Sequence, residues 1–235
     1  MATQVLLVRH GDTQASQDNR FTGAIDIPLS KEGRIHAAEL ATRLARFPID
    51  AVYASNMQRA QETAGFVARV HGLDVTPVPE FREVNHGVWD GKNRQEILQL
   101  SGQAALDEFD RDPFHFRPET GESAEEVLQR AAPVLSQLVK KHNGQTIFVV
   151  AHETTNRLLI CKFMGLDPAQ YRSKLAQRPA CLNLLQFPNE NEAQLMVLND
   201  IGHYGHSHAS QYDEYVVWAW AKGAYRMSPI SEALF

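Results

Sequence analysis

The sequence predicts an α/β fold in three layers, with a mostly parallel, twisted sheet and helices on both of its faces. Residues 4–8 and 146–151 form short, almost wholly apolar runs, the pattern of strands buried on both faces. Segments with helical apolar spacing alternate with such runs, which favours helices that connect parallel strands. The chain has 235 residues and is 43% hydrophobic, so one domain can bury a core without disulfides or metals.

The first half of the chain alternates expected strands and helices. The helix after the first strand has the clearest boundaries, because Ser30 can cap it, Leu40 and Leu44 lie at helical spacing, and Pro48 lies just beyond its end. The elements expected in this half are a strand at residues 4–8, a helix at 30–46, a strand at 51–54, a helix at 57–71 and a strand at 74–77.

The second half continues this alternation and closes with two strands. Ser123 and Glu126 form a capping-box pattern that begins a helix running towards His142, and Pro133 is expected to bend it. The elements expected after that helix are a strand at residues 146–151, a helix at 154–164, and closing strands at 181–187 and 194–198 around a turn at 188–191.

The chain shows no repeat, no low-complexity tract and no linker long enough to divide it. A single domain over residues 1–235 is therefore predicted. Within it, residues at about 101–120 are expected to form a mobile insert over the site, and residues at about 200–235 an aromatic C-terminal extension.

Charge and composition restrict the class of partner. With 28 acidic and 23 basic residues, the formal charge of −5 gives no general attraction to nucleic acid or to anionic membranes. The apolar run at residues 5–8 is too short for a signal peptide, and no later run reaches membrane-spanning length. Cys161 and Cys181 lie in apolar sequence without Cys-x-x-Cys spacing, so neither a disulfide nor a thiolate metal site is expected. A cytoplasmic location is predicted.

The first motif, Arg9-His10-Gly11-Asp12-Thr13, follows the first expected strand. Open α/β sheets bind ligands at the carboxyl ends of their strands. Arginine offers planar, paired donors to phosphate oxygens, and a neutral imidazole nitrogen can attack phosphorus when an acceptor holds its other nitrogen. The alternative is an arginine paired with a surface acid beside an ordinary histidine.

Three further residues could complete a phosphate site. Arg59 lies in the first turn of the helix after the second strand and could be a second clamp, or a solvent-facing arginine. Glu83 lies in a loop rich in glycine and aromatic residues, where desolvation can turn a carboxyl group into a proton donor; the alternative is an ion pair with Arg82. His152 ends a buried strand just before a helix whose free amides favour anions, or is a satisfied core histidine.

Together these segments resemble the histidine phosphatase superfamily, which also contains the cofactor-dependent phosphoglycerate mutases. The resemblance covers most of residues 4–198. It rests on Arg-His-Gly-x-Thr from Arg9, Arg-Ala-x-x-Thr-Ala from Arg59, the Arg-Glu loop with Gly-x-Trp-x-Gly after Glu83, and the strand-end His152. It implies a phosphoglycerate mutase-like fold and a phosphoric monoester hydrolase of the histidine acid phosphatase type that needs no metal or other cofactor.

The resemblance also implies a role for each site residue. His10 accepts the phosphoryl group, and Glu83 protonates the leaving oxygen and then activates water. Arg9, Arg59 and His152 hold the phosphate oxygens. Thr13, Ser16, Thr22 and Gly23 are expected as secondary contacts, and Gly121-Glu122-Ser123 matches a family signature to which we assign a structural role.

Two positions depart from the family pattern. Ser16 stands where asparagine is common, and it can still donate to a phosphate oxygen. Glu153 stands where glycine usually follows the second histidine, and it adds negative charge beside an expected anion site. Its side chain is expected either to point away or to contact a cationic group of the substrate.

Hydrolysis is favoured over two alternatives. A mutase of this family uses a longer, basic insert between the glutamate and the second histidine, whereas the basic residues here are offset by acidic ones and include no adjacent arginine pair. Lys92, Arg94, Arg111 and Arg117 are the basic residues present in the insert region itself. The second alternative, a non-catalytic phosphate-binding protein, is disfavoured by intact His10, Glu83 and His152.

The expected partner is a small-molecule phosphate ester, with sugar phosphates, phosphoglycerates and phosphoserine all open. Neither nucleic acid nor membrane is expected to bind. The tail carries His203, His206 and His208, a weak indication of a metal site. Its aromatic residues favour packing over the domain or across a possible homodimer interface.

Overall fold

The computed structural model describes residues 1–205. The chain divides into two compact units, Met1–Ile201 and Gly202–Phe235, and the fold described below is that of the first. His206, His208 and most of the expected C-terminal extension lie outside the described residues. The single-domain organisation and the role of the extension therefore stay predictions.

The sheet has six strands in the order β3-β2-β4-β1-β5-β6. Its first four strands are parallel, whereas β5 is antiparallel to both β1 and β6. The strands are β1 (Thr3–Arg9), β2 (Ala51–Ala54), β3 (Val75–Pro77), β4 (Thr146–Ala151), β5 (Leu182–Asn189) and β6 (Glu192–Asp200). The apolar run of β1 is completely buried from Val5 to Val8, as its composition predicts for a strand between two neighbours.

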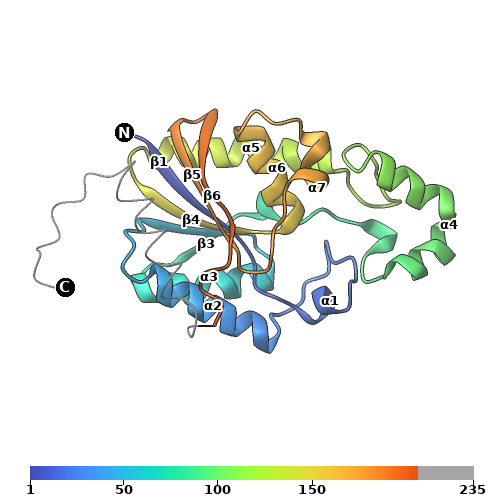
Figure 1. The fold of residues 1–235 in the computed structure, drawn as a ribbon, viewed down its shortest axis with the longest axis horizontal. Coiled ribbons are helices and arrows are strands. Elements are labelled where there is room, and N and C mark those ends of the chain that lie inside the picture. The colour runs from blue at the N-terminus through green and yellow to red at the C-terminus, as the bar shows by residue number, and fades with distance from the viewer. Residues whose placement is uncertain (206–235) are drawn as a thin grey trace, which may run out of the picture. The chain divides into compact units, whose positions relative to one another are not determined.

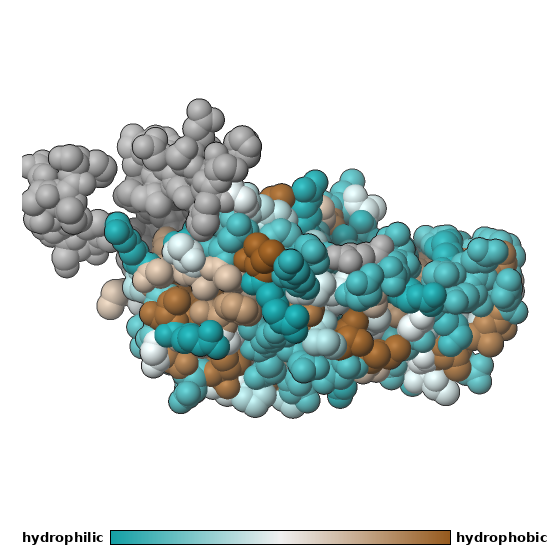
Figure 2. Space-filling model, turned by 90° about the horizontal axis from the view of Figure 1, so that it is seen from below, coloured by the Kyte–Doolittle hydropathy of each residue, from teal (hydrophilic) through white to brown (hydrophobic). Residues whose placement is uncertain are grey.

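Helices cover both faces of the sheet, so the predicted three-layer α/β fold is confirmed (Figure 1). One layer contains α2 (Lys31–Leu44) and α3 (Gln58–His71), and the other contains α5 (Ala124–Lys141) and α6 (Glu153–Phe163). Ser30 caps α2, and Ser123 and Glu126 form the capping box of α5. Seen from the side of α2 and α3, the described surface is mostly hydrophilic (Figure 2), as expected for helices that bury only one face.

Shorter elements and one long helix lie on the side of the sheet where β1 and β4 end (Figure 1). They are α1 (Gln14–Gln17), α4 (Arg94–Arg111), α7 (Tyr171–Lys174) and the 3₁₀ turns Pro79–Phe81, Gly87–Trp89 and Pro168–Gln170. No helix within residues 1–205 is both long and apolar enough to cross a membrane.

Helix α4 takes up the first half of the expected insert. It bends at Gly102, whose φ of +78° is not helical, and it has a small hydrophobic core of its own, separate from the core around the sheet. This α4 core contains Trp89, Ile97, Leu106 and Phe109. The expected mobility of residues 101–120 stays a prediction.

The closing hairpin is tighter than expected. Residues 188–191 were predicted to form the turn, but β5 continues to Asn189, which pairs with Glu192, so only Glu190 and Asn191 connect the strands. The prediction was wrong because Pro188 tolerates extended backbone and requires no turn.

The two cysteines are buried and free within the described part of the chain. Burial raises the pKa of the Cys161 thiol and of the Cys181 thiol to about 11. Both thiols therefore stay protonated near neutral pH, the state typical of structural rather than nucleophilic cysteines.

Candidate active site

The predicted motifs meet at the carboxyl ends of neighbouring strands. The backbone N–H of His10 donates to Ala151 O at 3.0 Å, which joins the segments that follow β1 and β4. The N–H of Gly11 donates to Thr63 Oγ1 at 3.0 Å, which joins the first motif to α3. The N–H of Thr154 donates to Glu83 Oε2 at 3.0 Å. Four segments far apart in sequence are thus in direct contact.

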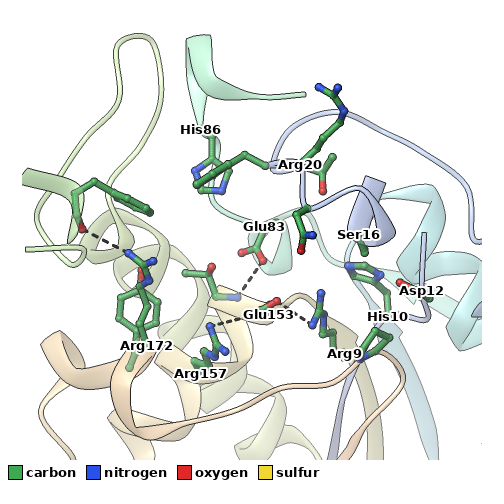
Figure 3. A pocket seen from close by; sticks show the side chains of 17 residues that line it. Arg9, His10, Asp12, Ser16, Arg20, Glu83, His86, Glu153, Arg157 and Arg172 are labelled. Carbon is green, nitrogen blue, oxygen red and sulfur yellow. Dashed lines mark hydrogen bonds and ion pairs between the residues drawn. The ribbon is translucent and has the colours of Figure 1, made fainter. Parts of the chain in front are cut away.

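These segments surround a cavity of about 490 Å³, shown in Figure 3. Of the predicted site residues, Arg9, His10, Ser16, Thr22 and Glu83 line it. The remaining lining residues are Asp12, Asn19, Arg20, Phe21, His86, Phe109, Glu153, Thr154, Arg157, Tyr171, Arg172 and Pro179. Four arginines and three carboxylates are among these lining residues, and Glu153 pairs with both Arg9 and Arg157.

His10 has the state that a nucleophile requires. Its side chain is 6% exposed, and Nδ1 lies 2.7 Å from Gly11 O. Burial, supported by the charges of Arg59 and Arg9, holds the pKa of His10 well below its ordinary value, so the ring is neutral near pH 7. Because a carbonyl oxygen can only accept, Nδ1 carries the proton and Nε2 keeps its lone pair.

His152 lies beside His10 and is completely buried, with 5.0 Å between the two ring centroids. Burial and the charge of Arg59 lower the pKa of His152 well below its ordinary value, so this ring is also neutral. Within residues 1–205, neither of its ring nitrogens has a hydrogen-bond partner. The alternative of a satisfied core histidine is therefore wrong, because a buried polar group without a partner costs free energy unless a ligand supplies one.

Arg9 presents one edge of its guanidinium group for a ligand. Nη1 donates to Gln177 O at 2.5 Å and lies 2.8 Å from Glu153 Oε2. These two contacts use both hydrogens of Nη1. Nε is buried and has no partner among the described residues. The Nε and Nη2 hydrogens point to the same side of the group, so together they form the fork that suits two oxygens of a phosphate.

Arg59 is 1% exposed, so the alternative of a solvent-facing arginine is wrong. Nη1 donates to Ile25 O at 2.8 Å, and Nη2 donates to Gly23 O at 3.0 Å. Burial lowers the pKa of Arg59 while the charge of Glu83 opposes the shift, and an arginine remains protonated in proteins. Its charge acts on both His10 and His152, whereas its direct contact with phosphate stays a prediction.

The carboxyl group of Glu83 is fixed by two backbone donors. Oε1 accepts from Val84 N at 2.9 Å, and Oε2 accepts from Thr154 N at 3.0 Å, in the first turn of α6. The predicted alternative, an ion pair with Arg82, is absent from the ion pairs of the described residues. One amide at the start of α6 is thus used by Glu83, so fewer of these amides remain for an anion than the sequence suggested.

Comparison with known proteins assigns the family. Residues 5–201 match the model of the histidine phosphatase superfamily (branch 1). The chain belongs to this superfamily. It is 30% identical over 173 residues to phosphoserine phosphatase 1 of Hydrogenobacter thermophilus, covering 72% of this chain and 80% of that protein. It is 28% identical over 214 residues to the probable phosphoglycerate mutase GpmB of Escherichia fergusonii, covering 90% and 98%.

The solved structure of Bacillus stearothermophilus YhfR is similar in fold, with a TM-score of 0.80 and 29% identity, covering 86% of this chain and 98% of that one. The phosphoglycerate mutase-like fold and the membership predicted from the motifs are confirmed. The phosphatase interpretation is confirmed at the level of this histidine phosphatase family.

The secondary residues of this histidine phosphatase take different places. Ser16 and Thr22 line the cavity. Thr13 is buried beneath it, where its Oγ1 lies 2.8 Å from Ser16 Oγ and caps α1. Gly23 lies behind the wall, where its carbonyl accepts from Arg59 and its N–H donates to Asp90 Oδ1 at 2.6 Å. Phosphate contacts of these four residues stay predictions.

Gly23 allows its loop to pack directly on the loop that carries Glu83. A Cβ atom at this position would lie 1.8 Å from Val84 O. We expect Gly23→Ala to lower the free energy of unfolding by about 1–3 kcal/mol, the usual cost of overpacking, as measured by urea denaturation. Gly65→Ala is the matched control: a Cβ there meets nothing within 4 Å, and alanine favours helix α3. An equal loss in both variants would contradict this assignment.

The Gly121-Glu122-Ser123 signature supports the Glu83 loop. Glu122 Oε1 accepts from Asn85 N at 3.0 Å and from Arg130 Nη2 at 2.7 Å. Arg130 in turn donates to Glu80 O and to Glu83 O, at 2.5 and 3.1 Å. The structural role assigned from the sequence therefore includes holding the loop of the expected proton donor against α5.

Glu153 neither points away from the cavity nor stands alone. Its Oε2 pairs with Arg9 and its Oε1 lies 2.7 Å from Arg157 Nη1 (Figure 3). Arg157 was not predicted as a site residue, although its i,i+4 spacing from Glu153 places both on one side of α6. Arg172, whose guanidinium lies 4.3 Å over the ring of Phe109, was not predicted either, because it has no local sequence signal.

Metal ligands do not gather in the part of the chain that the structure describes: residues 1–205 contain no group of three or more His, Cys, Asp or Glu side chains placed to hold an ion. The expected metal alternative in the tail depends on His206 and His208, which lie outside those residues.

Proposed function

We propose that this chain hydrolyses phosphate monoesters of small metabolites, without a metal, through a phosphohistidine on His10. One observation carries the proposal: a neutral, buried imidazole lies beside buried nitrogens of Arg9 and His152 that lack partners within residues 1–205. An anion with several acceptor oxygens satisfies such donors. Phosphoryl transfer needs mainly positioning and charge stabilisation, which arginine and histidine can supply.

The reaction has two steps. In the first, His10 Nε2 attacks phosphorus in line with the leaving oxygen, the P–O bond breaks, and Glu83 gives its proton to the departing alkoxide. In the second, Glu83 takes a proton from water, whose oxygen attacks phosphorus, and the P–N bond breaks to release inorganic phosphate and neutral His10. Arg9, Arg59 and His152 stabilise charge on the phosphoryl oxygens, with Thr13, Ser16, Thr22 and Gly23 in supporting roles.

The test is turnover of 4-nitrophenyl phosphate in excess chelator, combined with acid and alkali treatment of the rapidly quenched protein. We expect full activity with chelator and a phosphoprotein that is labile in acid and stable in base, as phosphohistidine is. Peptide mapping should place the label on His10. Loss of activity on chelation, or a label on another residue, would refute the mechanism.

Mutase activity is the second candidate, because one similar protein is a probable phosphoglycerate mutase. Hydrolysis is favoured by the cavity wall, since none of the four basic residues of the insert region lines it among the described residues. Arg94 pairs with Asp110, and Arg117 pairs with Glu126. The acid phosphatase type, the cytoplasmic location and the possible homodimer stay predictions, and phosphoserine belongs to the proposed substrate class.

A further inference from the structure

Glu153 places a carboxylate within the cationic part of the cavity. It lies between Arg9 and Arg157, at 2.8 and 2.7 Å from their Nη1 atoms, and its side chain remains 32% exposed (Figure 3). The Glu153 carboxylate contacts only the Nη1 atom of Arg9 and the Nη1 atom of Arg157. The Nε atoms of Arg9 and Arg157 are both buried without a partner within residues 1–205, so Glu153 leaves the phosphate fork of Arg9 open.

The cavity continues beyond Glu153, away from His10. This outer part is lined by Arg157, Tyr171, Arg172 and Phe109, and Figure 3 shows Arg157 and Arg172 on the opposite side of Glu153 from His10. A phosphate held at His10 would therefore direct its leaving group towards the exposed part of the Glu153 carboxylate.

The cations of this outer part give little net attraction to a second anion. Arg157 shares its charge with Glu153 itself. Arg172 keeps its full charge, because its contacts with the ring and the carbonyl oxygen of Phe109 are with neutral groups, but it is exposed, so water and salt screen that charge. Charges in a partly enclosed cavity are screened less than charges in free solution, so a like charge near Glu153 is unfavourable.

We propose that Glu153 determines specificity: it makes the site select esters whose leaving group carries no net negative charge and reject those whose leaving group is a net anion. This inference rests on the proposed phosphatase function. It follows the general rule that discrimination arises from repulsion of the wrong ligand as well as attraction of the right one. A purely structural alternative exists, since an acidic residue in the first turn of α6 stabilises the helix dipole.

The test compares two esters with the same carbon skeleton, glycerol 3-phosphate and 3-phosphoglycerate. The first carries a neutral hydroxymethyl group where the second carries a carboxylate. We expect wild type to prefer glycerol 3-phosphate in kcat/KM. Glu153→Gln should reduce that preference by about tenfold, equivalent to one like-charge contact, mainly by raising kcat/KM for 3-phosphoglycerate. An unchanged ratio, even with a lowered Tm, would leave only the structural role and overturn the proposal.

The matched control is Glu62→Gln. Glu62 is also paired with arginine, accepting from Nε and Nη2 of Arg34 at 2.5 and 3.3 Å, and it is 26% exposed, but it does not line the described cavity. This variant should keep the wild-type ratio. If Glu62→Gln changed the ratio as much as Glu153→Gln, the effect would not be local and the proposal would fail.

Binding separates this inference from the proposed function. In a His10→Ala background, calorimetry measures the affinities of both esters without turnover, with and without Glu153→Gln. If wild type hydrolyses no ester but Glu153→Gln still strengthens binding of 3-phosphoglycerate relative to glycerol 3-phosphate, the phosphatase assignment fails while the role of Glu153 holds. If turnover is normal and the affinity ratio does not change, only the role of Glu153 fails.

Discussion

A His10→Ala variant is expected to lose phosphatase turnover by at least about 10⁴-fold, the scale on which loss of a covalent nucleophile acts. The reason lies in the state of the ring, which lines the cavity: it is neutral, its Nδ1 is held by Gly11 O, and its Nε2 therefore keeps a free lone pair. An alanine at this position leaves the arginines but no atom that can form the P–N bond. The measurements are steady-state kcat with 4-nitrophenyl phosphate and the yield of phosphoprotein, both of which should vanish together.

The control for this loss is His71→Ala. His71 is on α3, where its Nε2 lies 3.1 Å from Leu44 O, and it does not line the described cavity. It should keep kcat within about twofold of wild type, as substitutions away from a site usually do. Retained phosphoprotein in His10→Ala would show that another residue is the nucleophile.

A Glu83→Gln variant is expected to slow hydrolysis of alkyl phosphates at least about 100-fold, the range for loss of a general acid. Glutamine has nearly the same shape and can keep one of the two backbone bonds from Val84 N and Thr154 N, but it has no proton to give to an alkoxide. The decisive measurement is the rate of phosphoprotein formation with two leaving groups. That rate should fall sharply with glycerol 3-phosphate and much less with 4-nitrophenyl phosphate, whose leaving group departs without protonation.

An equal loss with both leaving groups would contradict the role of Glu83 as a proton donor. Because Glu83 also holds the start of α6, the Tm of the variant has to be measured beside its rates. Glu83→Asp is the companion variant: it keeps an acid but shortens its reach, so partial activity with the same dependence on the leaving group is expected.

Local signals were sufficient for most of the sheet and its helices. The apolar runs that became β2 and β4 were predicted with the bounds that they have, because each is closed by polar residues at both ends. Ser30 located the start of α2 through its bond to Gly33 N. Helix α4 was missed because Gly102 interrupts its periodicity, although Asn93 and Glu96 form a capping box at its start.

The part of the site that could be predicted from the sequence consists of residues that directly follow strands. His10 and His152 come directly after β1 and β4, and parallel neighbours place such residues side by side. The remaining wall depends on tertiary packing. Arg172 reaches the cavity through its contact with Phe109, more than 60 positions away in the chain, and no pattern within either segment predicts that meeting.

Because α4 has a core of its own, part of the cavity wall is supported separately from the two site histidines. Phe109 belongs to this α4 core and also lines the cavity, whereas His10 and His152 follow strands anchored in the core around the sheet. Changes in α4 can therefore alter which alcohol fits without disturbing the chemistry of bond cleavage. Laboratory evolution towards new substrates would do best to vary Phe109, where this core meets the cavity, and natural variants of this architecture can change their range of esters by the same route.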